Sequence, residues 1–234
     1  MAGRILELDA KQWAAVTAEA RDGGGTTAVG TALAEHLGAP VRATLVSTSG
    51  SSGTVTRLTM VGDKVLLVIQ VIAERDGETF LAPGAELRFA TVDDLWPALT
   101  AALPPFEALR APASAARVAP QGQPQTDGPV LDRAELVRLL DDEQANLQVS
   151  VEAWGTSAAP QVVWPRLWSV VDGKLLDVRT DDGALAPVER PAGSVAAELQ
   201  WALAGAVDAT TPSPGTTGND GTDGTTGTEG EAGR

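Results

Sequence analysis

The sequence contains no cysteine, no tyrosine and only one histidine. The absence of cysteine and the scarcity of histidine exclude several kinds of metal and catalytic site. Without cysteine there is neither a disulfide framework nor a thiolate metal site. A single histidine, His36, excludes any metal site that needs two histidine ligands. We therefore expect no bound metal and no cofactor.

Basic residues are scarce: 17 Lys and Arg stand against 31 Asp and Glu, for a formal net charge of -14. A nucleic-acid-binding face needs clustered Lys and Arg to neutralise phosphates, and the sequence has no such cluster. Anionic membrane surfaces are disfavoured for the same reason. No apolar run approaches the roughly 18 residues of a spanning helix, and the first residues lack a signal-peptide core. We expect a cytosolic protein that binds no nucleic acid and does not insert into a membrane.

Motifs that carry catalysis are also missing. There is no Gly-x-Ser-x-Gly elbow for a nucleophilic serine. Residues 25–31 (GTTAVGT) have the outline of a phosphate-binding loop, but they lack its lysine and no predicted strand precedes them. His36 falls late in a short predicted helix, where an interaction with the helix dipole explains it. We expect no enzymatic activity and no small-molecule substrate.

The chain contains an internal sequence repeat. Residues 57–71 read RLTMVGDKVLLVIQV and residues 166–178 read RLWSVVDGKLLDV. Each copy has two apolar runs around a turn with Gly and Asp, which predicts a β-hairpin. Alignment of Arg57 with Arg166 also pairs Val61 with Val170. Two flanking pairs recur in the same order: residues 8–13 with 131–136, and residues 91–103 with 193–207. We interpret this order as a duplication.

The predicted fold class is therefore α+β: two pseudo-repeated halves share a twisted, mainly antiparallel sheet flanked by helices. We expect a single domain over residues 1–207, made of pseudo-repeats 1–110 and 130–207 with a linker at 111–129. Residues 208–234 are acidic and rich in Thr and Gly, with no apolar surface to bury, so we expect a disordered tail. The predicted helices span residues 8–20, 31–37, 93–103, 132–145 and 194–207. The predicted strands span residues 41–47, 54–60, 64–73, 148–154, 162–171 and 174–180, with short extended pieces in 78–89 and at Val188.

Tryptophan provides the strongest hint of a binding surface. Trp154, Trp164 and Trp168 lie within fifteen residues in the second half. Trp164 and Trp168 are an even number of positions apart, so they share one face of a regular strand. Large aromatics on a strand are either core residues or anchors for a partner, and both alternatives stay open. Pro165 between them favours an edge strand, since proline cannot donate to a β-ladder.

With this layout, the chain resembles the EspG family of chaperones associated with ESX (type VII) secretion. The segments that carry the resemblance are VGDKVLL and VVDGKLL in the two hairpins, LPP at residues 103–105 and VLDRAELVRLL at the start of the second half. The resemblance implies an EspG-like fold and a cytosolic, non-enzymatic chaperone. Such a chaperone binds the apolar tip of the PPE subunit in a PE–PPE heterodimer, keeps this helical client soluble and directs its export.

The resemblance also places the partner-binding surface on the sheet and the second-half helices, where this chain has Trp154, Trp164, Trp168 and Trp201. Two alternatives from other classes remain. One is an immunity-type or regulatory protein that binds and blocks a toxin or enzyme, since such proteins are often strongly acidic. The other is an enzyme of unrecognised type, which the single histidine disfavours.

Overall fold

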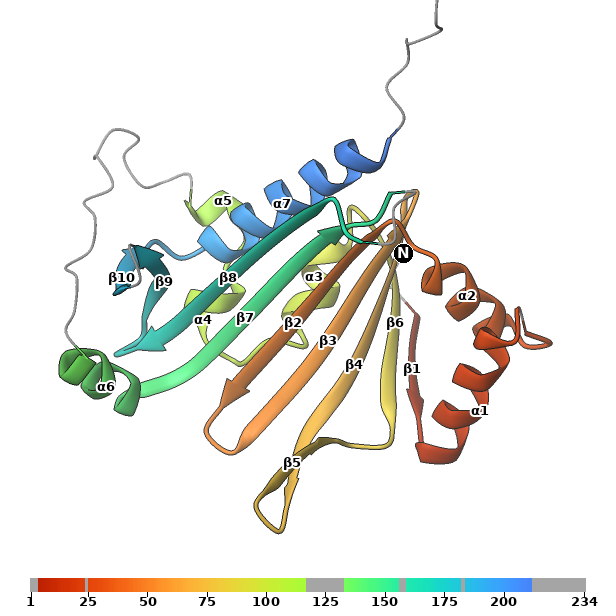
Figure 1. The fold of residues 1–234 in the computed structure, drawn as a ribbon, viewed down its shortest axis with the longest axis horizontal. Coiled ribbons are helices and arrows are strands. Elements are labelled where there is room, and N and C mark those ends of the chain that lie inside the picture. Colours follow the sequence, from red (N-terminus) through yellow and green to blue (C-terminus); the bar gives the residue numbers. More distant parts are fainter. Residues whose placement is uncertain (1–3, 24, 117–132, 156–158, 182–183, 212–234) are drawn as a thin grey trace, which may run out of the picture.

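A single antiparallel sheet organises the chain. The computed structural model describes residues 4–23, 25–116, 133–155, 159–181 and 184–211. In them, ten strands form one sheet in the order β1-β6-β4-β3-β2-β7-β8-β9-β10, with β5 beside β4 (Figure 1). The strands are β1 (Arg4–Leu8), β2 (Val41–Ser49), β3 (Ser52–Val61), β4 (Lys64–Arg75), β5 (Glu78–Leu81), β6 (Ala85–Thr91), β7 (Glu143–Ala153), β8 (Val162–Val171), β9 (Lys174–Asp181) and β10 (Ala184–Arg190). This confirms the predicted α+β class with an antiparallel sheet flanked by helices.

The helices belong to both halves of the chain. They are α1 (Ala10–Arg21), α2 (Ala28–Leu37), α3 (Leu95–Thr100), α4 (Glu107–Arg110), α5 (Ala113–Ala116), α6 (Arg133–Asp141) and α7 (Ser194–Thr210). None of the described helices is both long enough and apolar enough to span a bilayer.

The two halves meet at the centre of the sheet, where β2 pairs antiparallel with β7. Outward from this pair, β3, β4 and β6 follow on one side and β8, β9 and β10 on the other. The two hairpins that echo each other in sequence thus hold corresponding places, β3–β4 in one half and β8–β9 in the other. This correspondence supports the duplication, which we retain as an inference.

The register of the two hairpins differs by one residue from the sequence alignment. Val61 pairs with Lys64 across the first turn, and Val171 pairs with Lys174 across the second. Val61 therefore corresponds to Val171 and not to Val170. The turns place Gly and Asp in opposite order, Gly62 first in one and Asp172 first in the other, and both have positive φ. Because a shift of one residue exchanges the faces of a strand, Leu58 corresponds to Trp168, and both are completely buried.

The sheet has a different cover on each face. One face carries the larger core, in which β2, β3, β4, β7 and β8 pack against α3, α4 and α7. The other face carries a smaller core, in which α1 and α2 pack on β4 and β6. Burial alternates strictly along β7 from Ala145 to Ala153, so its side chains toward this second face are polar. Figure 1 shows β2 and β7 without a covering helix on this side.

Side-chain caps set the start of the first two helices. Asp9 caps α1 and forms a reciprocal capping box with Gln12, because the side chain of each residue accepts from the backbone N–H of the other. The second helix begins at Ala28, earlier than expected, because Thr27 accepts a capping bond from Gly30. The segment at 78–89 forms two strands, β5 and β6.

Other predicted boundaries were wrong. Strand β1 was not predicted, and the helix predicted at 132–145 ends at Asp141, because β7 begins at Glu143. The short helix α5 lies inside the predicted linker 111–129, and α7 extends to Thr210, so the first residues of the predicted tail are helical. The rest of that linker from residue 117, and the tail from residue 212, lie outside the described residues. In the second half, α6 directly precedes β7, and in the first half α2 directly precedes β2. By position, α6 therefore corresponds to α2. The sequence pairing of residues 8–13 with 131–136 instead matched α6 with α1.

Candidate functional site

The outer edge of β8 is open along half of its length. Strand β8 pairs with β7 from Val162 to Val171, but with β9 only over residues 168–171. Strand β9 then turns away and pairs with β10. Within the described part of the chain, no strand pairs with residues 162–167 on this side. Pro165 lies in this segment, as expected for an edge strand.

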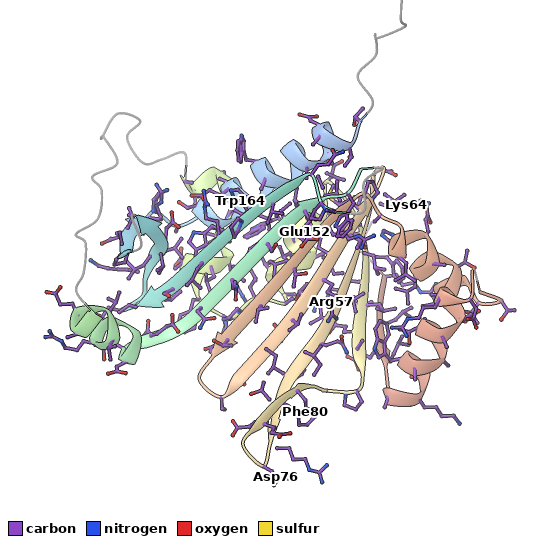
Figure 2. The ribbon with its side chains drawn as sticks, in the orientation of Figure 1. Arg57, Lys64, Asp76, Phe80, Glu152 and Trp164 are labelled. Atoms are coloured by element: carbon purple, nitrogen blue, oxygen red, sulfur yellow. The ribbon has the colours of Figure 1, made fainter. Side chains whose placement is uncertain are left out.

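A groove lies between this open edge and α7. Trp164, which is labelled in Figure 2, and Arg166 come from β8. The opposite wall comes from α7 and the end of β10. The groove has a volume of about 290 Å³. Trp201 on α7 is 72% exposed, the largest exposed fraction among the large hydrophobic residues of the described chain. The lining residues are Trp164, Arg166, Arg190, Ala197, Glu198 and Trp201.

An ion-pair network forms the floor of the groove and joins four elements. Glu198 on α7 contacts Arg166 on β8 at 3.3 Å and Arg190 on β10 at 3.6 Å. Arg190 also donates to Asp177 on β9 at 3.2 Å, and Asp177 is completely buried. The guanidinium carbon of Arg166 lies 4.8 Å from the ring centroid of Trp164, within cation–π range. The network fixes the position of Trp164 relative to α7.

The structure separates the four tryptophans that sequence analysis assigned to partner binding. It brings Trp164 and Trp201 together in the groove. For Trp168 it selects the core alternative, because this side chain is completely buried. Trp154 lies just after β7, outside the groove; its indole N–H donates to Glu152 at 2.9 Å and its ring lies under Arg42.

The charged residues of the groove were missed by the sequence analysis. Asp177 gave a usable signal, since an acidic residue inside the apolar run KLLDV is expected to be either exposed or paired with a base. Its partner Arg190 lies on the next strand, which the sequence analysis reduced to a short piece at Val188. Arg166 and Glu198 carry no local signal because they meet only in the folded chain.

His36 has a structural place that differs from the expected one. It lies in the last turn of α2, as expected, but it is buried, and its Nδ1 lies 2.9 Å from the hydroxyl of Thr59 on β3. Burial lowers the pKa of His36 below its usual value, while Glu35 raises it and Lys64 lowers it. The sequence suggested that a charged His36 interacts with the helix dipole. Burial disfavours the charged form, so this explanation does not hold.

The loop with a phosphate-binding outline is already occupied by a carboxylate. Glu19 on α1 accepts from the backbone N–H of Thr27 and from the hydroxyls of Thr26 and Thr27. These hydrogen bonds, with that of the Thr27 backbone foremost, lower the pKa of Glu19. A Cβ built on Gly25 or Gly30 would overlap the Glu19 side chain. The glycines therefore make room for an internal acid. Among the described residues, no group of three His, Cys, Asp or Glu side chains is arranged to hold a metal ion.

Comparison with known proteins finds similarity only among solved structures. No family model matches the chain, and no curated protein matches it. Among solved structures, the chain is similar to a chain in the structure of the Mycobacterium tuberculosis type VII secretion system chaperone EspG5 in complex with the PE25–PPE41 dimer. The match covers 91% of this chain and 99% of that chain, at 9% identity and a TM-score of 0.47. Values this low transfer no residue and no partner to the present chain.

Proposed function

We propose that this protein is a secretion chaperone that binds a helical client, of the PE–PPE type, in the groove between α7 and the open edge of β8. The observation that carries the proposal is the position of Trp201, a large aromatic side chain exposed to solvent beside Trp164 at an unpaired strand edge. The resemblance noted in the sequence agrees with this function but supplies no residue of the site.

The geometry of the groove suits a helix. Amphipathic helices bind by placing an apolar face in a groove and inserting a few anchors at helical spacing. Strand β9 pairs with β8 only from Trp168 onward, so the groove is open along residues 162–167, where the client helix would lie. Tryptophan is enriched among the residues that dominate binding energy, because it buries a large rigid surface at low entropic cost.

The surrounding structure holds these anchors in place before a client arrives. Trp164 packs on Trp168, which belongs to the core, and the ion-pair network connects its strand to α7. Anchors that are already ordered lose less conformational entropy on binding. The strongly acidic surface keeps the protein soluble and disfavours acidic competitors.

Co-purification tests this proposal. The tagged full-length chain is co-expressed with each PE–PPE heterodimer encoded in the same genome, and a stable one-to-one complex with at least one of them is expected. Trp201→Ala and Trp164→Ala should each weaken this complex about tenfold or more, the effect of losing an interface anchor. The control is Phe80→Ala, which removes an exposed aromatic from β5 in the other half. If no heterodimer binds, or if both tryptophan variants bind like the wild type, the proposal is wrong.

A further inference from the structure

A second cavity lies far from the groove in strand order, between the α1–α2 pair and strands β3 and β4. Its volume is about 420 Å³, within the range of small-molecule sites. Its floor is apolar and buried, with Leu33, Leu66 and Val68 as the main contacts. Trp13 and Thr17 on α1 form one side.

The charge of this cavity is opposite to that of the protein. Two arginines, Arg21 and Arg57, line it together with His36, and no Asp or Glu does. Neither arginine forms an ion pair in the described part of the chain. The chain as a whole carries a net charge of -14, so two cations gathered at one apolar cavity without an acid are a marked exception. Such a site favours an anion.

A buried glutamine holds Arg57 at the cavity. Gln70 lies in the middle of β4, is 7% exposed and accepts a hydrogen bond of 2.7 Å from the Arg57 guanidinium. Its amide nitrogen lies 3.4 Å from the carbonyl of Ala82 and 3.5 Å from that of Gly84, which fixes the direction of the amide. A buried polar side chain in an apolar strand is costly unless it is hydrogen-bonded. Its placement here orients the guanidinium of Arg57 (labelled in Figure 2), and among the described residues this guanidinium makes no other hydrogen bond or ion pair.

We propose that this cavity binds a small amphiphilic anion, with its carboxylate or equivalent oxyanion on Arg57 and its apolar body against Trp13, Leu33 and Leu66. Arginine suits the head group because its planar fork binds a carboxylate through two parallel hydrogen bonds. The apolar floor suits an aliphatic chain. Among the described residues that line the cavity, His36 is the one side chain that could act as a base, and it is buried and already contacts Thr59. The proposal is therefore one of binding without transformation.

The binding test uses decanoate as the probe, with decanamide as a neutral molecule of the same length. Calorimetric titration of the full-length chain should show binding of decanoate and at least tenfold weaker binding of decanamide. Arg57→Met should weaken decanoate binding about tenfold or more, as expected for loss of a hydrogen-bonded charge. Arg75→Met is the matched control, because Arg75 is an exposed arginine at the far end of β4.

Two further variants make the result independent of folding defects. The double variant Arg57→Leu, Gln70→Leu removes both hydrogen-bond partners and leaves no buried amide unpaired, so it should fold and still fail to bind. A decanoate brominated at its last carbon should quench part of the tryptophan fluorescence, and Trp13→Phe should abolish that part. Equal binding of decanoate to wild type and to the double variant would overturn the proposal. So would binding of an acidic peptide in place of decanoate, which would make the cavity a protein-docking site.

Discussion

Trp164 and Trp168 lie on the same face of β8 with ring centroids 5.9 Å apart and ring planes tilted by 52°, yet only Trp168 is completely buried. The difference arises because β9 accompanies β8 only as far as Trp168. On the N-terminal side of Trp168, β8 pairs only with β7, and Trp164 is partly buried against the core while it also lines the groove beside α7. One aromatic pair thus connects the core of the protein to its proposed binding surface.

Stability measurements should separate the buried from the exposed tryptophans. Trp168→Ala removes the largest completely buried side chain and should cost about 3–5 kcal/mol of unfolding free energy. Trp201→Ala removes an exposed side chain and should change the unfolding free energy by no more than about 0.5 kcal/mol. Urea denaturation of both variants checks this. A Trp201 variant as unstable as the Trp168 variant would show that Trp201 serves the fold and not a partner.

The ion-pair network should be far more sensitive than a surface pair of the same chain. Arg190→Leu leaves the buried carboxylate of Asp177 without its arginine, and we expect a loss of about 3–5 kcal/mol. Lys174→Ala breaks the exposed pair with Glu189 and should cost no more than about 1 kcal/mol. Thermal melts of the two variants give the comparison. Similar losses in both would mean that the Asp177 carboxylate is stabilised by other groups.

The elements that were predicted correctly are those whose sequence signals lie close together in the chain. The turns at Gly62-Asp63 and Asp172-Gly173 identified both hairpins, because each turn and its flanking apolar runs are adjacent in sequence. The sequence alignment of the two hairpins was wrong by one residue. It matched identical residues, although Gly and Asp occupy the two turn positions in opposite order. Strand β1 was missed because its partner β6 lies at the other end of the first half.

The candidate site was predictable only in part, for the same reason. Even spacing correctly indicated that Trp164 and Trp168 share one face of their strand. Pro165 suggested an edge strand; β8 lies between β7 and β9, but Pro165 falls in the segment that pairs only with β7. Strand β9 pairs with β8 only from Trp168 onward, so Trp168 is completely buried and Trp164 only partly. No sequence pattern indicates where the two strands separate. The meeting of Arg166 with Glu198 depends on the packing of α7 against β8, which joins residues from two distant elements.

The burial of His36 predicts a loss of stability on acidification. Its pKa in the folded state is lowered, so the unfolded chain, with a His pKa near about 6.5, takes up a proton first. As the pH falls below about 6.5, protonation therefore favours the unfolded state. His36→Asn keeps a polar partner for Thr59 but cannot be protonated. Between pH 7.5 and 5.5, the urea midpoint of the wild type should fall more than that of the variant, and parallel curves would contradict the assignment.

Truncation tests the expectation for the C-terminal residues. The segment 212–234 contains no aliphatic side chain larger than alanine, so its removal should take no apolar surface from the core. A chain that ends after Thr211 retains all of α7 and should melt within a few degrees of the full-length protein. A chain that ends before Ala202 is the destabilised comparison, since it loses the buried Ala202, Leu203 and Ala206. A large drop in melting temperature for the shorter deletion would show that the tail contributes to the fold.

Gly205 offers a way to block the proposed groove without disturbing the fold. It lies one helical turn after Trp201 on α7, and a Cβ built on it meets nothing within 4 Å. Glycine is a poor helix former, so Gly205→Gln should raise the unfolding free energy by about 0.5–1 kcal/mol. The longer side chain would nevertheless occupy the space next to Trp201 that a client helix needs. We expect a protein that melts higher and captures the client heterodimer more weakly. The same substitution at Gly38, which also has open space around its Cβ position but lies at the end of α2, should leave capture unchanged. Full capture by the Gly205 variant would place the client on another face of the molecule.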